Sequence, residues 1–171
     1  APSSVPQYPI GRQWFDIYPN GIPMIEAGPR EKEILEQDCL ASLNLLKNYI
    51  DALCLKHQLT YKDCFIIGFS QGAIMSFELG KYINKIFAGC VLLSGRILPS
   101  ENHNKSPFIK TPMMITHGDQ DTVLEPKYFD EACNILSNEG FIFESSLIKG
   151  EAHTISLKML QLVQNFIKKN V

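Results

Sequence analysis

The amino-acid sequence predicts an α/β fold in which a mostly parallel sheet carries helices on both faces. Short apolar runs that end in glycine or polar residues alternate with longer amphipathic segments along the chain. This alternation is typical of parallel strands joined by helical crossovers, which cover both faces of the sheet. The strands are expected at about 64–67, 90–94, 113–117 and 142–148.

The composition fits one folded domain. The chain has 171 residues, of which 45% are hydrophobic, so a single domain over 1–171 can bury a core. A net charge of −2 without a block of basic residues gives no reason to expect a nucleic-acid partner. The longest apolar runs are too short for an integral membrane segment. These properties predict a soluble protein.

The cysteines indicate the cellular compartment. They are five in number, widely spaced, and contain no C-x-x-C pair. This pattern favours reduced, buried thiols in a cytoplasmic protein over a disulfide framework or a zinc site. The residues concerned are Cys39, Cys54, Cys64, Cys90 and Cys133.

The chain before the first strand divides into loops and a helix. Residues 1–29 are rich in proline and glycine around the stretch QWFDI, which predicts ordered loops. Apolar residues then recur every three or four positions from 30 to 57, which predicts a long amphipathic helix that begins after Pro29. Its apolar positions are Leu35, Cys39, Leu43, Leu46, Ile50 and Leu53.

The stretch CFIIGFSQGA, residues 64–73, places Ser70 between two glycines where a buried strand meets a helix. An ordinary turn is one interpretation, since glycine and serine are common in loops. The other is a strained strand-to-helix turn that presents a nucleophilic serine, where Gly68 and Gly72 lack a Cβ that would clash with the neighbouring strand and helix. The backbone N–H of Gln71 would then point to the same place and stabilise an oxyanion. The apolar strand before the motif favours this second interpretation.

Three further helices are expected, alternating with the strands. The first follows Ser70, the second begins at Pro126 and is capped by Gly140, and the last ends in Lys168 and Lys169, where cations suit the helix dipole. Their apolar positions are Ala73, Ile74, Phe77 and Tyr82 in the first, Phe129, Ala132, Cys133 and Leu136 in the second, and Leu157, Leu160, Val163, Phe166 and Ile167 in the last.

A serine nucleophile needs a base, and an open α/β sheet with such a turn supplies the acid and the histidine later in the chain, in that order. His57 precedes Ser70, and His103 lies in a polar loop that favours a solvated side chain. His117, at the end of a strand, could be a structural hydrogen-bonding residue. His153 follows the last strand, where such sheets gather their chemistry, so we predict that it is the base rather than a surface histidine.

The orienting acid is expected in the loop after the third strand. The stretch ITHGDQDTVLEP offers Asp119 and Asp121 there. One of them is expected to be structural and to bond the backbone of its own turn. The residues alone do not separate the two.

Five stretches in order, WFDI, GFSQGA, LSGRILP, HGDQDTVLEP and GEAHTIS, resemble the carboxylesterase/phospholipase family of α/β-hydrolases, which includes acyl-protein thioesterases and lysophospholipases. The resemblance runs over nearly the whole chain. It implies that Asp121 is the catalytic acid. It also implies hydrolysis of acyl esters or thioesters, including lysophospholipids and acylated proteins, without metal or organic cofactor.

Two features depart from the family pattern. LSGRILP has one residue more than is usual and lacks an aromatic residue. In addition, the family's first two strands, and the loop that gives the second oxyanion donor, have no counterpart after Ala1. Right-handed crossovers extend the sheet in one direction from the Ser70 strand, so we expect about 40 to 60 further residues before Ala1 to fill the other flank.

The predicted function is that of a serine hydrolase acting through Ser70, His153 and Asp121 with an acyl-enzyme intermediate. A hydrolase-like binding protein is an alternative of another class, and a peptidase or lactone hydrolase is an alternative within enzymes. Trp14 and Leu98 are expected to contact substrate, although Trp14 could instead anchor the N-terminal loops. The apolar loop residues that fit an acyl chain, or else belong to the core, are Ile22, Met24, Ile97 and Leu98.

Overall fold

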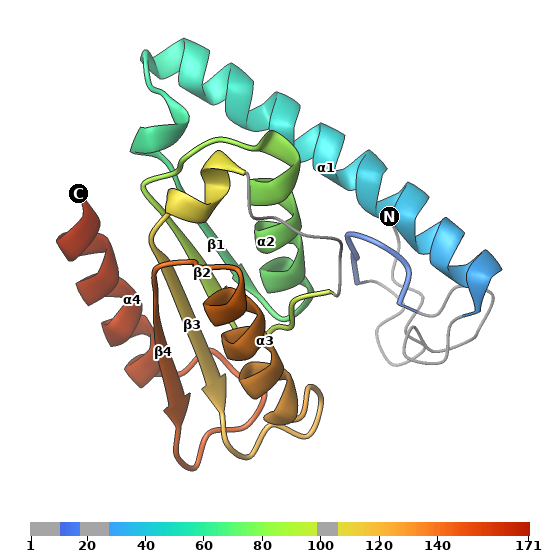
Figure 1. Ribbon diagram of the computed structural model, residues 1–171, viewed down its shortest axis with the longest axis vertical. Helices are drawn as coiled ribbons and strands as arrows, with labels where there is room; N and C mark the ends of the chain where they lie inside the picture. The colour runs from blue at the N-terminus through green and yellow to red at the C-terminus, as the bar shows by residue number, and fades with distance from the viewer. Residues whose placement is uncertain (1–10, 18–27, 99–105) are drawn as a thin grey trace. The chain divides into compact units, whose positions relative to one another are not determined.

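The computed structural model describes residues 11–17, 28–98 and 106–171, with the backbone alone at positions 29, 31 and 32. The chain forms two compact units, 1–50 and 51–171, and each is described by itself (Figure 1). The boundary falls inside the long helix α1 (Pro29–His57). The prediction of a single domain stays a prediction.

In the first unit, residues 11–17 are held to α1 by hydrogen bonds. The hydroxyl of Ser42 donates to the carbonyl of Trp14, and the N–H of Asp16 donates to Asp38 Oδ2 at 3.3 Å. Phe15 between them is fully buried. Leu35, Cys39 and Leu43 form a buried stripe at a spacing of four, as predicted for this helix, whereas Leu53 near its end is exposed.

The second unit contains a four-stranded parallel sheet in the order β1-β2-β3-β4 (Figure 1). The four predicted strands are confirmed within two residues, and the sheet extends in one direction from the strand that precedes Ser70. Among the described residues, no strand pairs with the outer side of β1. The strands are β1 (Phe65–Phe69), β2 (Gly89–Leu93), β3 (Met113–Gly118) and β4 (Phe143–Ile148).

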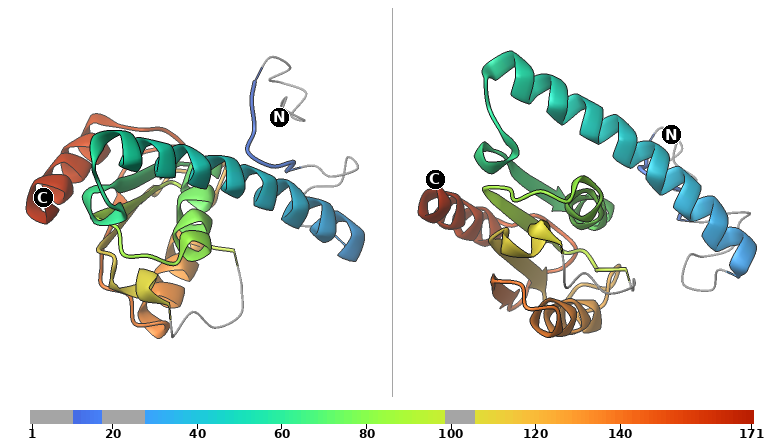
Figure 2. Two further views of the ribbon diagram at one scale, coloured as in Figure 1. Left: turned by 90° about the horizontal axis from the view of Figure 1, so that it is seen from above. Right: turned by 45° about the horizontal axis from the view of Figure 1, so that its top comes forward.

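Helices cover both faces of this sheet, as predicted (Figure 2). α2 (Gln71–Ile83) and α3 (Lys127–Asn138) lie on one face, and α4 (Leu157–Asn170) lies on the other. Successive side chains of a strand point to opposite faces of the sheet, so each inner strand contributes side chains to the packing on both faces. The core under α4 consists of Val91, Leu93, Met114, Val163 and Phe166, with Phe65, Phe69, Leu162 and Ile167 packed against it.

The buried face of α4 includes the predicted Val163 and Phe166 but differs from the prediction in its first turn. Met159, Val163 and Phe166 are buried, whereas Leu157 and Leu160 are exposed. Both sets of residues follow the three- and four-residue spacing of a helical stripe. The choice between them is made by contact with the sheet, where Phe166 packs edge-on against the Phe65 ring with centroids 6.3 Å apart.

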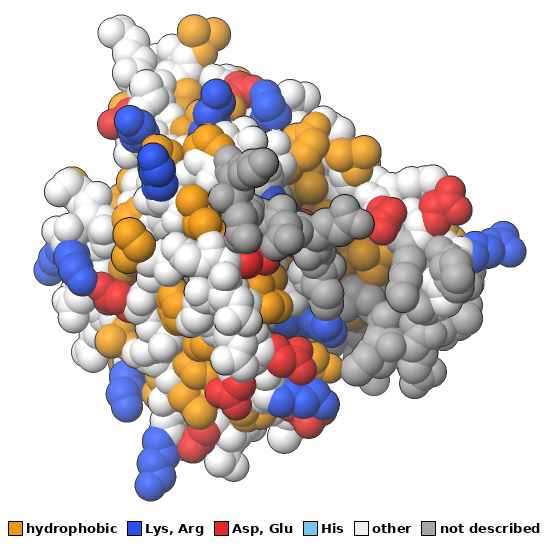
Figure 3. Space-filling model, in the orientation of Figure 1, with side chains coloured by type: hydrophobic (Ala, Val, Ile, Leu, Met, Phe, Trp, Pro, Cys, Tyr) orange, Lys and Arg blue, Asp and Glu red, His pale blue; other side chains and the backbone are white. Residues whose placement is uncertain are grey.

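Charged side chains of both signs are interspersed on the face drawn in Figure 3, in keeping with a net charge of −2. Within the described residues, no helix is both long and apolar enough to cross a bilayer.

A hydrogen-bonded tyrosine lies at the entry to β1. Tyr61, in a single 3-10 turn (Tyr61–Asp63), donates its hydroxyl hydrogen to Asp51 Oδ1. Burial, and then this hydrogen bond, raise the pKa of Tyr61 to about 12. Burial also raises the pKa of the neighbouring Cys64 thiol to about 11, and its Sγ lies 3.6 Å from Cys54 Sγ. Folding therefore favours the protonated form of both side chains over the charged form.

We predict that Tyr61→Phe lowers the free energy of unfolding by about 1 kcal/mol at pH 8, the value of one partly exposed hydrogen bond. A tyrosine pKa raised from 10.0 to about 12 on folding contributes stability below pH 10 that is lost as the pH rises through 12. The difference between wild type and variant should therefore shrink in urea unfolding at pH 11. Tyr49→Phe, at an exposed position of α1, is the control. A difference that stays constant with pH would contradict the role of Tyr61.

Candidate active site

Ser70 occupies a strained turn between β1 and α2. Its backbone has φ 54° and ψ −121°, on the left-handed side of conformational space that residues with a Cβ rarely adopt. The N–H of Ser70 donates to the carbonyl of Leu93 at the end of β2, at 2.9 Å, and its own carbonyl accepts from the N–H groups of Ala73 and Ile74 in α2. The strained turn that the sequence predicts is thus present, and both neighbouring elements hold it.

The two glycines of the motif differ in what surrounds them. A Cβ at Gly68 would lie 2.0 Å from the carbonyl oxygen of Gly72 and 2.6 Å from the nitrogen of Ala73. A Cβ at Gly72 would have no described atom within 4 Å. The clash predicted for both glycines is therefore found at Gly68 alone in the described part of the chain.

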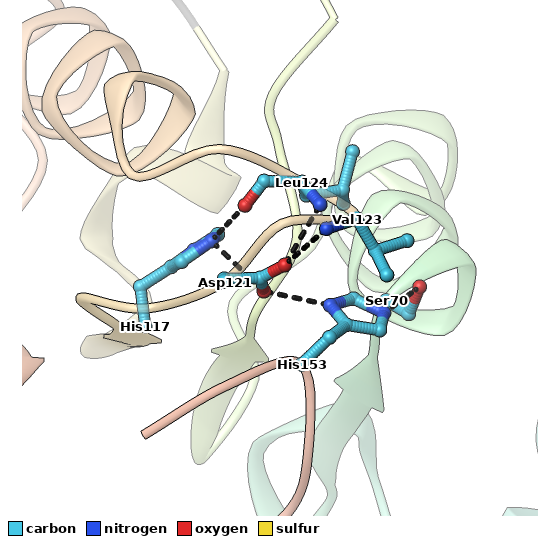
Figure 4. A network of polar contacts seen from close by, with 6 residues as sticks. All are labelled: Ser70, His117, Asp121, Val123, Leu124 and His153. Atoms are coloured by element: carbon cyan, nitrogen blue, oxygen red, sulfur yellow. Dashed lines mark hydrogen bonds and ion pairs between the residues drawn. The ribbon is translucent and has the colours of Figure 1, made fainter. Parts of the chain in front are cut away.

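Three loops at the carboxyl ends of β1, β3 and β4 bring Ser70, Asp121 and His153 together (Figure 4). His153 Nε2 lies 2.9 Å from Ser70 Oγ, and His153 Nδ1 lies 2.7 Å from Asp121 Oδ2. Because a carboxylate only accepts hydrogen bonds, the proton belongs on Nδ1, which leaves Nε2 as an acceptor for the serine hydroxyl. This arrangement can remove a proton from Ser70.

Asp121 is 2% exposed, and both of its oxygens are hydrogen-bonded. Oδ1 accepts from the backbone N–H groups of Val123 at 2.9 Å and Leu124 at 2.8 Å. Oδ2 accepts from His153 and lies 3.3 Å from Nε2 of His117, which is itself fully buried. A buried carboxylate is costly unless it is paired in this way, so the surroundings of Asp121 suit its charged form.

Asp119 has a different set of contacts. Its Oδ1 accepts from the backbone N–H of Gly150 at 2.6 Å, and the N–H of Gln120 donates to the carbonyl of Glu151 at 2.9 Å. These bonds join the loop after β3 to the loop that carries His153. A Cβ at Gly118 would lie 2.2 Å from the carbonyl oxygen of Glu151, so the close approach of the two loops requires glycine there.

The expectation that one of the two aspartates bonds its own turn is met by Asp121 and not by Asp119. Asp121 bonds its own turn through one oxygen and His153 through the other. Asp119 bonds the other loop instead.

The imidazole of His153 is also held by packing. The ring of Phe69, the residue before Ser70, lies with its centroid 4.8 Å from that of His153, at an interplanar angle of 40°. The side chain of His153 is 15% exposed. It is thus oriented by neighbours and still reachable from solvent.

For the other predicted site residues, the structure gives their position along the chain and their exposure. Gln71 is the first residue of α2, where the N–H groups of a helix have no acceptor one turn earlier in the same helix. Leu98 is half-buried beyond the end of β2, and Ile97 before it is buried. Trp14 belongs to the first unit and is 43% exposed. The roles of Gln71, Leu98 and Trp14 stay predictions.

Three residues weighed in the sequence, Ile22, Met24 and His103, lie outside the described residues. Within 11–17, 28–98 and 106–171, no group of three or more His, Cys, Asp or Glu side chains is arranged to hold a metal ion.

Comparison with known families decides the assignment. The sequence model of the Phospholipase/Carboxylesterase family matches residues 1–171. The chain belongs to the phospholipase/carboxylesterase family. The family, the α/β-hydrolase fold and the class of ester or thioester hydrolase predicted from the sequence are confirmed by this assignment and by the relatives described next.

Relatives of this family cover most of the chain. Acyl-protein thioesterase 1 of Candida albicans is 30% identical over 165 residues, which are 92% of this chain and 68% of that protein. Carboxylesterase SOBER1 of Arabidopsis thaliana is 27% identical over 166 residues, or 95% of this chain and 69% of that protein. The crystal structure of esterase PE8 has a TM-score of 0.82 at 23% identity, covering 100% of this chain and 76% of that one. This last likeness supports the fold.

We predict that Gly68→Ala and Gly72→Ala differ sharply. The alanine Cβ at position 68 would overlap the backbone of α2, so we expect a loss of about 3 kcal/mol or more of stability and displacement of Ser70. Gly72 lies in α2, where alanine is the better helix former, so stability there should change by less than about 1 kcal/mol. Urea unfolding and esterase activity of both variants test this. Equal losses would contradict the role of Gly68 in the turn.

Proposed function

We propose that the chain is a serine hydrolase that cleaves acyl esters or thioesters through Ser70, His153 and Asp121. The observation that carries this proposal is the continuous hydrogen-bonded path from Ser70 Oγ through His153 to Asp121 Oδ2, at 2.9 and 2.7 Å. The path begins at a strained serine at the start of a helix, the position of an exposed nucleophile in this fold.

The reaction follows from these positions. His153 Nε2 takes the hydroxyl proton as Ser70 Oγ attacks the acyl carbonyl, and Asp121 supports the imidazolium that forms. The tetrahedral intermediate collapses, and His153 gives the proton to the leaving alcohol or thiol. Water then attacks the acyl-enzyme, with His153 acting as base once more, and releases the acid and Ser70.

The developing oxyanion needs donors beside Ser70. The backbone N–H of Gln71 is the proposed first donor, and the N-terminal end of α2 adds positive potential at the same place. Loss of one such donor commonly costs about 100- to 1,000-fold in rate. The second donor is expected from a loop other than those that hold the three catalytic residues.

The proposed substrates are long-chain acyl thioesters of proteins, with lysophospholipids and simple carboxylic esters as further candidates. The names of relatives support this choice, because Acyl-protein thioesterase 1 of Candida albicans and Carboxylesterase SOBER1 align over more than nine tenths of the chain. Leu98 and Trp14 are proposed to contact the acyl chain. A cytoplasmic location is part of the same proposal. The alternative of a non-catalytic binding protein is not favoured, since such a protein would not need this hydrogen-bonded set.

We predict that Ser70→Ala lowers the kcat for a p-nitrophenyl ester and for a palmitoylated peptide thioester by about 10⁴-fold or more, because no nucleophile remains. Ser76→Ala is the matched control, since Ser76 lies in α2, the helix that follows Ser70, and its hydroxyl donates to the carbonyl of Gly72 at 2.9 Å. Circular dichroism should report a folded protein for both variants. Retained turnover in folded Ser70→Ala would exclude the serine mechanism.

We also predict that Asp121→Asn costs far more activity than Asp119→Asn. An amide beside His153 Nδ1 favours the wrong imidazole tautomer, an effect of about 10⁴-fold in serine proteases. An asparagine at 119 keeps an oxygen that can accept from Gly150, so its cost should stay below about 10-fold. Measurement of kcat/KM for the two variants decides between the carboxylates. The opposite ranking would refute the assignment of Asp121.

A further inference from the structure

The proposed reaction leaves one buried histidine next to its catalytic acid without a role. His117 lies in β3 and is 0% exposed. Its Nε2 is 2.7 Å from the carbonyl oxygen of Leu124 and 3.3 Å from Asp121 Oδ2 (Figure 4). It therefore approaches the same carboxylate oxygen as His153, from the strand instead of the loop.

The neighbours of His117 fix its tautomer. The carbonyl of Leu124 only accepts, so Nε2 must carry a proton and donate it to Leu124, while Asp121 Oδ2 lies 3.3 Å from the same nitrogen. Nδ1 is buried and has no hydrogen-bond partner among the described residues. A proton there would be an unsatisfied buried donor, which is costly, so the ring is neutral with its hydrogen on Nε2.

We propose that His117 is a positioning residue that acts through Asp121, an inference that rests on the proposed function. Two backbone N–H groups hold Oδ1 of Asp121, whereas Oδ2, the oxygen that orients His153, is hydrogen-bonded to His153 alone among the described residues. The protonated Nε2 of His117, 3.3 Å away, is the other polar group that faces this oxygen. It fixes the rotation of the carboxylate, and its bond to Leu124 holds the turn that presents Asp121.

The first test replaces the donor. His117→Met and His117→Phe fill the site without an N–H, so they remove both the bond to Leu124 and the polar group that faces Asp121 Oδ2. We expect kcat to fall about 10-fold, with KM changed by less than 3-fold. His117→Gln carries an amide N–H of similar reach and should recover most of that loss. Thr111→Val is the control, because it removes a buried acceptor of the Phe87 N–H outside the Asp121 network. It should lower Tm and leave kcat unchanged.

The second test separates positioning from general stability. In an Asp121→Asn background, His117→Met should slow the labelling of Ser70 by a fluorophosphonate by less than 3-fold, because the carboxylate on which it acts is gone. Equal slowing in both backgrounds would overturn the proposal, as would failure of His117→Gln to recover activity. Turnover by Ser70→Ala would instead overturn the proposed function itself.

A third test needs no variant to fold. Nitrogen-15 NMR of histidine-labelled wild type distinguishes the two neutral tautomers and the imidazolium. The expected result for His117 is a hydrogen on Nε2 and none on Nδ1. A hydrogen on Nδ1 would overturn the proposal.

Discussion

The site depends on the hydrogen bonds that stabilise the buried carboxylate of Asp121. An ionised group removed from water costs several kcal/mol unless its lone pairs are filled. Three donors bond to its oxygens, two backbone N–H groups of the turn that carries Asp121 and the imidazole of His153, and Nε2 of the buried His117 lies 3.3 Å from Oδ2. The requirement to pair one charge therefore fixes the turn after β3, the orientation of a strand residue and the imidazole that faces Ser70.

The parallel sheet makes this convergence possible because its carboxyl ends open on one edge. β1 ends at Ser70, β3 leads to Asp121, and β4 leads to His153. β2 supplies no member of the set, yet the carbonyl of Leu93 at its end accepts the N–H of Ser70 and so holds the strained turn. Each strand of the sheet thus contributes either a reacting group or the support of one.

How much could be predicted from the sequence depends on whether the signal is local. The strands and the turn at Ser70 were predictable because short apolar runs and the G-x-S-x-G spacing reflect neighbours in sequence. The buried face of α4 was not, since two residue stripes have helical spacing and only the sheet selects Met159 over Leu160. Asp119 and Asp121 follow one strand and are chemically alike. Contacts with Gly150 and His153, 31 and 32 residues further on, distinguish them.

The geometry also separates proton transfer from oxyanion binding. Among the described residues, the hydrogen bonds that orient Ser70, Asp121 and His153 come from the second unit, including the bond between Asp119 and Gly150. The proton path is therefore fixed by the sheet and its three loops. In the proposed function, stabilisation of the oxyanion is assigned to Gln71 and a second donor, and Trp14 and Leu98 are proposed to contact the acyl chain. If these proposed roles hold, substitutions of Trp14 should alter KM, whereas substitutions around Asp121 should alter kcat.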